Sequence, residues 1–212
     1  MRLFCSQKDL DFALNIVNKA ISPNNTLPVL NNILIKAEGK KIYFSSTNLE
    51  IAINCSIDAD VRTEGKITVP AKLITNYISL LTDEKVELSV IDGLTLSVNS
   101  SSSNTKIKCI NADEFPLIPK IEKGQELKIK NKIIQEALSE TIFAASTNTS
   151  RPVLSGVYFY INGKKLVVVA TDSYRLAEKT ITLEKEFKED ISCIIPAKTL
   201  SELLKITNKT LK

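Results

Sequence analysis

The feature that most constrains this fold is an internal repeat. When the sequence is shifted by 124 residues, so that Pro28 lies over Pro152, the tripeptides PVL and GKK coincide in the two copies. With two more residues inserted in the second copy, VPAK at 69–72 meets IPAK at 195–198. Several identities in one fixed order indicate a duplication, so the chain is predicted to contain two copies of one domain.

Each copy is itself predicted to be doubled. The first copy reads as a strand, a helix and three strands, and then the same order again, with tight turns such as Asp92-Gly93 between strands. Strands joined by tight turns pair in antiparallel fashion, so the predicted class is α+β, built from β-α-β-β-β units with helices on one face. In the first copy the predicted strands are 2–6, 32–37, 41–47, 50–57, 66–70, 86–91, 94–99 and 105–110, and the predicted helices are 8–21 and 71–81.

Residues 111–126 break this periodicity and separate the two copies. The stretch NADEFPLIPKIEKGQE holds prolines and a glycine, residue types that interrupt helices and strands. The predicted domains are therefore 1–121 and 127–212.

The second copy stops after its second helix, where the first copy continues with three strands. A second domain truncated in this way is expected to be the less stable one. The leucines of its last helix are expected to be poorly buried, namely Leu200, Leu203 and Leu204.

Composition argues against several classes of protein. Histidine is absent, and no two of the four cysteines form a C-x-x-C pair, so a His-based triad, a zinc site and a redox pair are not predicted. Glycine-rich phosphate and dinucleotide motifs are missing as well. We therefore predict no catalytic residue, metal or cofactor, and we expect the cysteines to be buried, reduced thiols.

The sequence also carries no sign of membrane insertion or export. No apolar run approaches the ~20 residues that a membrane span needs, and the N-terminus MRLFCSQKDLDF lacks the pattern of a signal peptide. A cytoplasmic protein without membrane contact is expected.

Basic and amide side chains recur on the predicted helices, and Lys198 and Lys205 lie on one side of theirs. A solvated polar face explains each set alone, whereas equivalent helices lining one surface would form a band of contacts to the phosphates of duplex DNA. The net charge of +4, carried entirely by residues 122–212, permits such contacts. On helix 71–81 the expected polar face is Lys72, Thr75, Asn76 and Ser79, and the expected apolar face is Leu73, Tyr77, Leu80 and Leu81.

Several motifs together resemble the bacterial sliding clamp family, the β subunits of the replicative DNA polymerase III. TDSYRLA at 171–177 is similar to the family's T-D-G-H-R-L-A motif, SRPVLSGV at 150–157 to the segment before it, and NADEFPLIP at 111–119 to the end of the family's first domain. The resemblance covers the whole chain. It implies repeated clamp domains, with helices on the inner face of a ring and antiparallel sheets outside. The family has three such domains, of which the third is absent from this chain.

The resemblance implies a peptide-docking cleft where the strand ends at Thr171. In the family this cleft receives short linear peptides from polymerases, the clamp loader and repair proteins. Ser173 stands where the family usually has glycine, and Tyr174 where it usually has histidine, so the pocket's shape and peptide preference are expected to differ. The partner-binding residues implied are Leu154, Thr171, Ser173, Tyr174, Arg175 and Leu176.

The resemblance also implies contacts to double-stranded DNA. The family places a basic residue in the loop before TLPVL, where this chain has Asn24, and the same loop of the second copy offers Asn148 and Arg151. With the helix lysines, the implied DNA-binding residues are Asn24, Lys72, Asn148, Arg151, Lys198 and Lys205. The other implied partners are the DNA polymerase III catalytic subunit, the clamp loader, further proteins with a clamp-binding motif and, for the full-length protein, a second copy in a homodimer ring.

Three functions are weighed on these grounds. The leading one is a non-catalytic processivity factor that encircles duplex DNA and tethers the polymerase. A truncated or paralogous clamp fragment would act only as a peptide-binding module, and this chain alone is not expected to close into a dimer. An enzyme that uses the fold with a Cys or Ser nucleophile is disfavoured, because neither a histidine nor a nucleophile motif is present.

Overall fold

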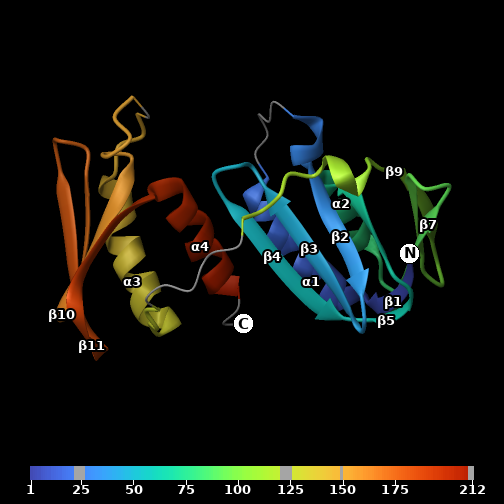
Figure 1. Ribbon diagram of the computed structural model, residues 1–212, viewed down its shortest axis with the longest axis horizontal. Helices are drawn as coiled ribbons and strands as arrows, with labels where there is room; N and C mark the ends of the chain where they lie inside the picture. Colours follow the sequence, from blue (N-terminus) through green and yellow to red (C-terminus); the bar gives the residue numbers. More distant parts are fainter. Residues whose placement is uncertain (22–26, 120–125, 149, 210–212) are drawn as a thin grey trace. The chain divides into compact units, whose positions relative to one another are not determined.

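The computed structural model describes residues 1–21, 27–119, 126–148 and 150–209. The chain divides into two compact units, Met1–Ile121 and Glu122–Lys212. Both units combine helices with antiparallel strands, so the predicted α+β class is confirmed (Figure 1). Among the described residues, no helix is both long and apolar enough to cross a membrane.

The first unit follows the predicted strand–helix–strand order, with one short additional strand, β5. Its elements are β1 (Arg2–Ser6), α1 (Gln7–Val17), η1 (Asn18–Ala20), η2 (Pro28–Asn31), β2 (Asn32–Glu38), β3 (Lys41–Thr47), β4 (Ala52–Asp58), β5 (Asp60–Thr63), β6 (Gly65–Pro70), α2 (Ala71–Leu80), β7 (Lys85–Ile91), β8 (Thr95–Asn99), β9 (Asn104–Lys108) and η3 (Ala112–Glu114). The strands form two antiparallel sheets, ordered β5-β1-β7-β8-β9 and β4-β3-β2-β6. Both sheets and both α-helices contribute side chains to one hydrophobic core.

Helix α1 shows how the sequence fixes a local element. Ser6 precedes it with extended backbone angles, and its hydroxyl accepts a hydrogen bond from the backbone N–H of Asp9 at 3.5 Å. This side-chain cap satisfies one of the free N–H groups at the start of the helix. The α-helix ends at Val17, before the end of the predicted range 8–21, and its buried residues Leu10, Ala13, Leu14 and Val17 recur at helical spacing. Figure 1 shows α1 lying across the face of β3 and β4.

The predicted orientation of α2 is wrong. Leu73 and Leu80 are exposed, Leu80 by 81%, whereas Thr75 of the supposed polar face is buried. The helix starts directly after β6 with no loop residue between them, so the path of the strand decides which face turns inward. The buried face is Ala71, Ile74, Thr75 and Ile78, followed by Leu81 at the C-cap.

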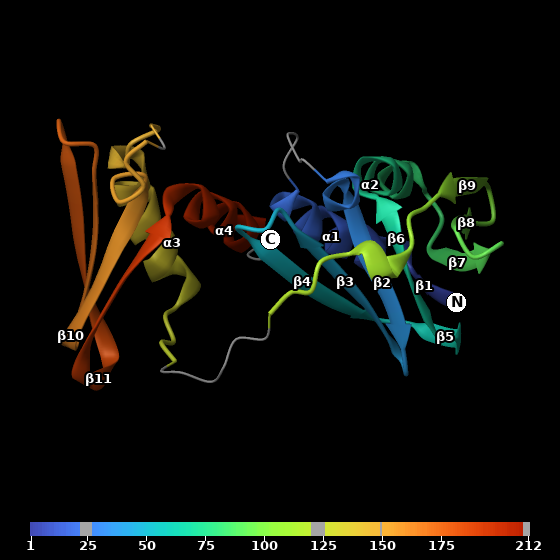
Figure 2. The same cartoon turned by 45° about the horizontal axis from the view of Figure 1, so that its top comes forward.

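The described residues of the second unit repeat the part of the first unit that runs from α1 to α2. The elements of the second unit are α3 (Asn131–Thr141), η4 (Ile142–Ala144), β10 (Gly156–Thr171), β11 (Leu176–Pro196) and α4 (Ala197–Lys209). Figures 1 and 2 both show α3 and α4 on the same side of the β10–β11 sheet. The helices and the sheet enclose a separate hydrophobic core.

Strand register confirms the repeat residue by residue. Thr171 pairs with Leu176, as Thr47 pairs with Ala52 at an offset of 124. At the far end Gly156 pairs with Pro196, as Asn32 pairs with Pro70 once two residues are inserted. β10 therefore corresponds to β2, its following turn and β3, and β11 corresponds to β4, β5 and β6. The equivalent turn glycines have similar positive φ, 61° at Gly39 and 56° at Gly163, a backbone conformation that favours glycine.

The two units use different side chains at one equivalent contact between the first helix and the sheet. In the second unit the Nζ of Lys179 on β11 lies 2.7 Å from a carboxylate oxygen of Glu136 and 2.9 Å from one of Glu140, both on α3. These pairings hold the pKa of Lys179 above its ordinary value. In the first unit the three equivalent positions hold apolar or weakly polar side chains, which are Cys55, Phe12 and Ile16.

Two expectations about burial need correction. Leu200 is only 3% exposed and belongs to the second core, so it is well buried, and Leu204 packs against the same core, whereas Leu203 is exposed as expected. The cysteines are free thiols, but only Cys5 is buried, and Cys193 is exposed on β11. The strand-like sequence around Cys193 did not reveal which face of the sheet it occupies.

Candidate functional site

The turn between β10 and β11 is built by its own polar side chains. The hydroxyl of Thr171 donates to the carbonyl of Arg175 at 2.7 Å and accepts from the backbone N–H of Ser173 at 3.1 Å. Asp172 Oδ1 accepts from the backbone N–H groups of Tyr174 and Arg175 at 2.9 and 3.0 Å. Threonine and aspartate favour turns because they supply such bonds. The polar side chains of Thr171 and Asp172 therefore serve to form the turn.

The first unit contains the same turn with other side chains. Thr47 donates to the carbonyl of Ile51 at 2.9 Å and accepts from the N–H of Leu49 at 3.0 Å. Asn48 Oδ1 accepts from the N–H groups of Glu50 and Ile51 at 3.0 and 2.8 Å. The hydrogen bonds of Thr171 thus belong to the duplicated fold, and only the side chains that differ between copies can give the second turn a function of its own.

A pocket of about 360 Å³ opens beside the second turn. On one side lies the loop before β10, and on the other lies the turn itself. The lining residues are Ala145, Ser146, Thr147, Asn148, Arg151, Leu154, Asp172, Tyr174 and Arg175.

This pocket brings together residues that the sequence assigned to two different roles. Leu154, Tyr174 and Arg175 come from the predicted peptide-binding set, whereas Asn148 and Arg151 come from the predicted DNA-binding set. The remaining peptide-binding candidates, Thr171, Ser173 and Leu176, belong to the adjoining turn and do not line the pocket.

The charges of the pocket leave it a net positive character. Arg175 Nε lies 3.0 Å from Asp172 Oδ2, and its guanidinium stands over the ring of Phe143 at 5.8 Å. Backbone N–H groups, that of Tyr174 first, and the guanidinium of Arg175 hold the pKa of Asp172 below its ordinary value. Arg151 is exposed and has no ion-pair partner among the described residues. The pocket lining thus holds one carboxylate, that of Asp172, and two guanidinium groups, those of Arg151 and Arg175.

Exposed apolar groups surround the same place. Tyr174 is 97% exposed, and Leu176, Val153 and Phe143 are also largely exposed. In the first unit the residue equivalent to Val153, Val29, is buried. The first turn also exposes one leucine, Leu49, but the positions equivalent to Phe143, Tyr174 and Leu176 hold Lys19, Glu50 and Ala52 there. The larger apolar rim of the second turn suits binding.

The other predicted DNA-binding residues are not part of this pocket. Lys72 is exposed on α2 of the first unit, and Lys198 is exposed near the start of α4. Lys205, further along α4, pairs with Glu202 at 2.6 Å, so its charge is partly used within the helix. Asn24 lies outside the described residues.

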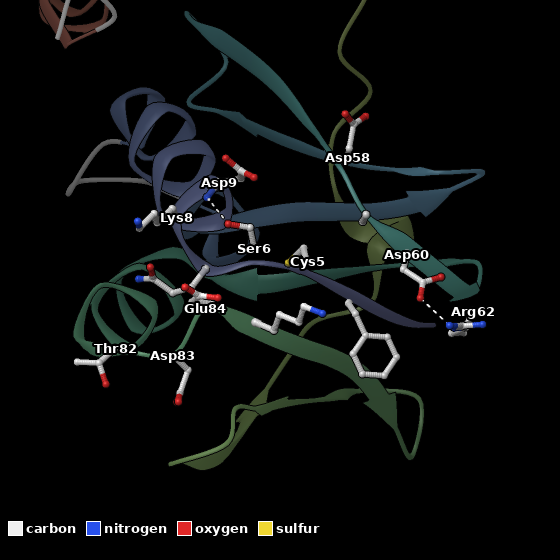
Figure 3. Close-up of a pocket in the computed structure, with 14 residues that line it drawn as sticks. Cys5, Ser6, Lys8, Asp9, Asp58, Asp60, Arg62, Thr82, Asp83 and Glu84 are labelled. Carbon is white, nitrogen blue, oxygen red and sulfur yellow. Dashed lines mark hydrogen bonds and ion pairs between the residues drawn. The ribbon is translucent and has the colours of Figure 1, made fainter.

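The first unit holds a larger cavity, of about 780 Å³, at the start of α1 (Figure 3). Figure 3 shows Ser6 and Asp9 on one side, Asp58 and the Asp60–Arg62 pair on another, and Thr82–Glu84 opposite. Cys5 also lines this cavity. Burial raises the pKa of the Cys5 thiol to about 12, and the nearby charge of Asp9 raises it by a smaller amount. A thiol with such a pKa stays protonated and is a poor nucleophile.

The acidic side chains of this cavity do not converge on one point. Asp60 pairs with Arg62 at 2.7 Å, and Asp83 accepts hydrogen bonds from Ser101 and Ser102, the latter at 2.5 Å. Across the described ranges, no group of three or more His, Cys, Asp or Glu side chains is placed to hold a metal ion. Asp60 and Asp83 are thus engaged with separate partners at the edges of this cavity.

Sequence reasoning missed two residues of the pocket region. Asp172 lies within the TDSYRLA motif but was not among the predicted site residues, although Asx chemistry at a strand end is a recognisable signal. Phe143 lies more than 25 residues before Arg175. No local pattern indicated that it would contact that guanidinium.

Comparison with known proteins gives one consistent result. Residues 1–119 match the family described as DNA polymerase III beta subunit, N-terminal domain, and residues 128–211 match its central domain. A beta sliding clamp from Synechocystis sp. is 35% identical over 222 residues, which cover 96% of this chain and 57% of that relative.

Solved structures agree with the sequence matches. The sliding clamp of Bacillus subtilis has a TM-score of 0.94 and 28% identity, covering 97% of this chain and 56% of that one. A sliding clamp of Pseudomonas aeruginosa, solved with griselimycin bound, has a TM-score of 0.92 and 25% identity, covering 99% of this chain and 57% of that one. The chain thus spans a little over half the length of the relatives it matches.

Proposed function

Because this chain belongs to the family of DNA polymerase III beta subunits, the sliding clamps, we propose that it forms part of a clamp that tethers a DNA polymerase to duplex DNA. The chain carries out no chemical reaction in this role. Its two domains, 1–121 and 127–212, present their helices to the DNA and their sheets to the outside. A homodimer ring is proposed for the full-length protein and not for this chain alone, and a cytoplasmic location belongs to the same proposal.

The pocket at the β10–β11 turn is the observation that carries the proposal. It combines a partly buried leucine, Leu154, with the exposed Tyr174 and two guanidinium groups. A short peptide with apolar residues and an acidic group fits such a surface, because apolar contacts supply affinity and charge supplies specificity. The peptides proposed are those of the DNA polymerase III catalytic subunit, the clamp loader and other clamp-binding proteins.

Contact with DNA is proposed to run through the phosphate backbone. Lys72, Lys198, Asn148 and Arg151 are exposed donors that suit phosphate oxygens. Lys205 and Asn24 are weaker candidates, the first because Glu202 already pairs with it. Binding of this kind is independent of base sequence and falls as salt rises.

Two titrations of the chain test this function. A fluorescein-labelled peptide with two leucines, an aspartate and a phenylalanine should bind, and Leu176→Ala should weaken binding about tenfold, as expected for an apolar hot spot. Leu49→Ala, at an exposed leucine of the equivalent first turn, serves as the matched control and should have no effect. Equal losses for both variants would contradict the proposed site.

A labelled DNA duplex tests the second half of the proposal. Lys198→Ala should weaken binding to unrelated duplexes to the same degree. It should also make binding less dependent on salt, by about 0.9 in the log–log slope for each phosphate that the variant no longer neutralises. A strong preference for one base sequence would count against the clamp. Peptide binding without any DNA binding would instead favour the second candidate, a clamp fragment that acts only as a peptide-binding module.

A further inference from the structure

Arg175 is held in place in a way that the turn itself does not require. Its Nε lies 3.0 Å from Asp172 Oδ2 in an ion pair, and the ring of Phe143 lies 5.8 Å from its guanidinium carbon. Both distances fall within the usual range of an ion pair and of a cation–π contact. The side chain remains 55% exposed, so these contacts fix its direction without burying it.

The first unit shows which parts of this arrangement are structural. There the same turn forms with Asn48 in place of Asp172 and with Ile51 in place of Arg175. The position equivalent to Phe143 is Lys19. The backbone bonds therefore need one side-chain oxygen at this place, and the second carboxylate oxygen of Asp172 is free to serve Arg175.

The fixed guanidinium still has donors to offer. A guanidinium group carries five N–H bonds in a planar fork, and the ion pair with Asp172 involves only the Nε side of that fork. Its two terminal nitrogens have no acceptor among the described residues. Arg175 lines the pocket with Arg151, which carries a second guanidinium that is not paired within the described part of the chain. A planar fork of this kind matches the two oxygens of a carboxylate.

We infer that Arg175 receives a carboxylate of the docked peptide, and that Asp172 and Phe143 are positioning residues that hold its guanidinium ready. This inference rests on the proposed docking function and names the chemistry of its ligand, an acidic peptide. Preorganisation is the physical gain, because ordering a flexible side chain on binding otherwise weakens affinity about two- to tenfold. The carboxylate comes either from an acidic side chain or from the C-terminus of the peptide.

Three labelled peptides distinguish these cases. The first is Gly-Leu-Asp-Leu-Phe-Gly with an amidated C-terminus, the second replaces its aspartate by asparagine, and the third carries the asparagine with a free C-terminal carboxylate. The wild-type chain should bind the first or the third at least fivefold more tightly than the second. Whichever carboxylate gives the gain is the one that Arg175 receives.

Variants then separate positioning from folding. Asp172→Asn keeps the acceptor that Asn48 provides in the first unit, so the turn should survive. Asp172→Asn and Phe143→Leu should each weaken the acidic peptide about three- to tenfold and the uncharged peptide less than twofold. Arg175→Lys should remove most of the discrimination, since lysine lacks the planar fork.

Matched controls lie in the first unit. Asp60→Asn breaks a comparable exposed pair with Arg62, and Phe12→Leu changes a comparably exposed ring, so neither should affect either peptide. Equal losses for charged and uncharged peptides in the Asp172 and Phe143 variants would overturn the positioning role, and so would binding that is indifferent to peptide charge. Failure of all three peptides to bind the wild-type chain would count against the docking function itself.

Discussion

Replacing Ser173 by glycine should stabilise the second unit, and replacing Leu49 by glycine should stabilise the first. Both residues have positive φ, 80° and 73°, at equivalent places in the two turns. A side chain with a Cβ costs roughly 1–2 kcal/mol in this left-handed region. Glycine loses about 0.5–1 kcal/mol more conformational freedom on folding. The difference predicts a gain of about 0.5–1 kcal/mol in the free energy of unfolding for each variant.

The assay must report on each unit separately, because two units need not unfold in one step. Urea titrations followed by hydrogen exchange and mass spectrometry give the stability of peptides from β3–β4 and from β10–β11. Ser173→Ala and Leu49→Ala keep the Cβ and serve as controls. Each glycine variant should exceed its alanine control in its own unit only. A glycine variant that is no more stable than its alanine control would refute the reasoning about backbone strain.

Three further predictions concern contacts outside the pocket. Lys179→Met should disturb the second unit far less than Leu138→Ala, which empties a fully buried site and should cost about 2–5 kcal/mol in thermal or urea unfolding. Hydrogen bonds from Ser101 and Ser102 hold the pKa of Asp83 below its ordinary value. The ionised Asp83 therefore stabilises the fold at pH values above the ordinary pKa of aspartate, and this stabilisation is lost as the pH falls below that pKa. The stability gap between wild type and Asp83→Asn should therefore be constant near neutral pH and shrink below about pH 4, as denaturation at several pH values would show. Timed alkylation with mass spectrometry should modify the exposed Cys193 first and Cys5 last, because burial both shields Cys5 and raises its pKa.

The fold was largely predictable because the chain contains its own template. A few shared tripeptides give an offset of 124 residues between the copies, and at this offset the paired residues of β3 and β4 match the paired residues of β10 and β11. Alternation along the strands and the 3.6-residue period of α1 add the local detail. Where two apolar faces compete, as on α2, the pattern alone could not choose between Leu73 and Ile74. The direct connection of α2 to β6 determines which face of the helix is buried.

The site was predictable only in part. The resemblance selected Leu154, Tyr174 and Arg175, and all three line the pocket. It did not separate side chains that build the turn, such as Thr171, from those that are free to bind, because both lie in one motif. Phe143 could not be found at all, since its contact with Arg175 joins segments that are distant in sequence.

The central claim is that the second turn and its pocket form a peptide-docking site, whereas the equivalent first turn does not. Titration of the isotopically labelled chain with the amidated Gly-Leu-Asp-Leu-Phe-Gly peptide, followed by backbone NMR shifts, tests this directly. The account predicts concentration-dependent changes at Asn148, Leu154 and residues 172–176, and none at residues 48–51. Changes centred on the first turn or on the cavity beside α1, with none at residues 172–176, would contradict it.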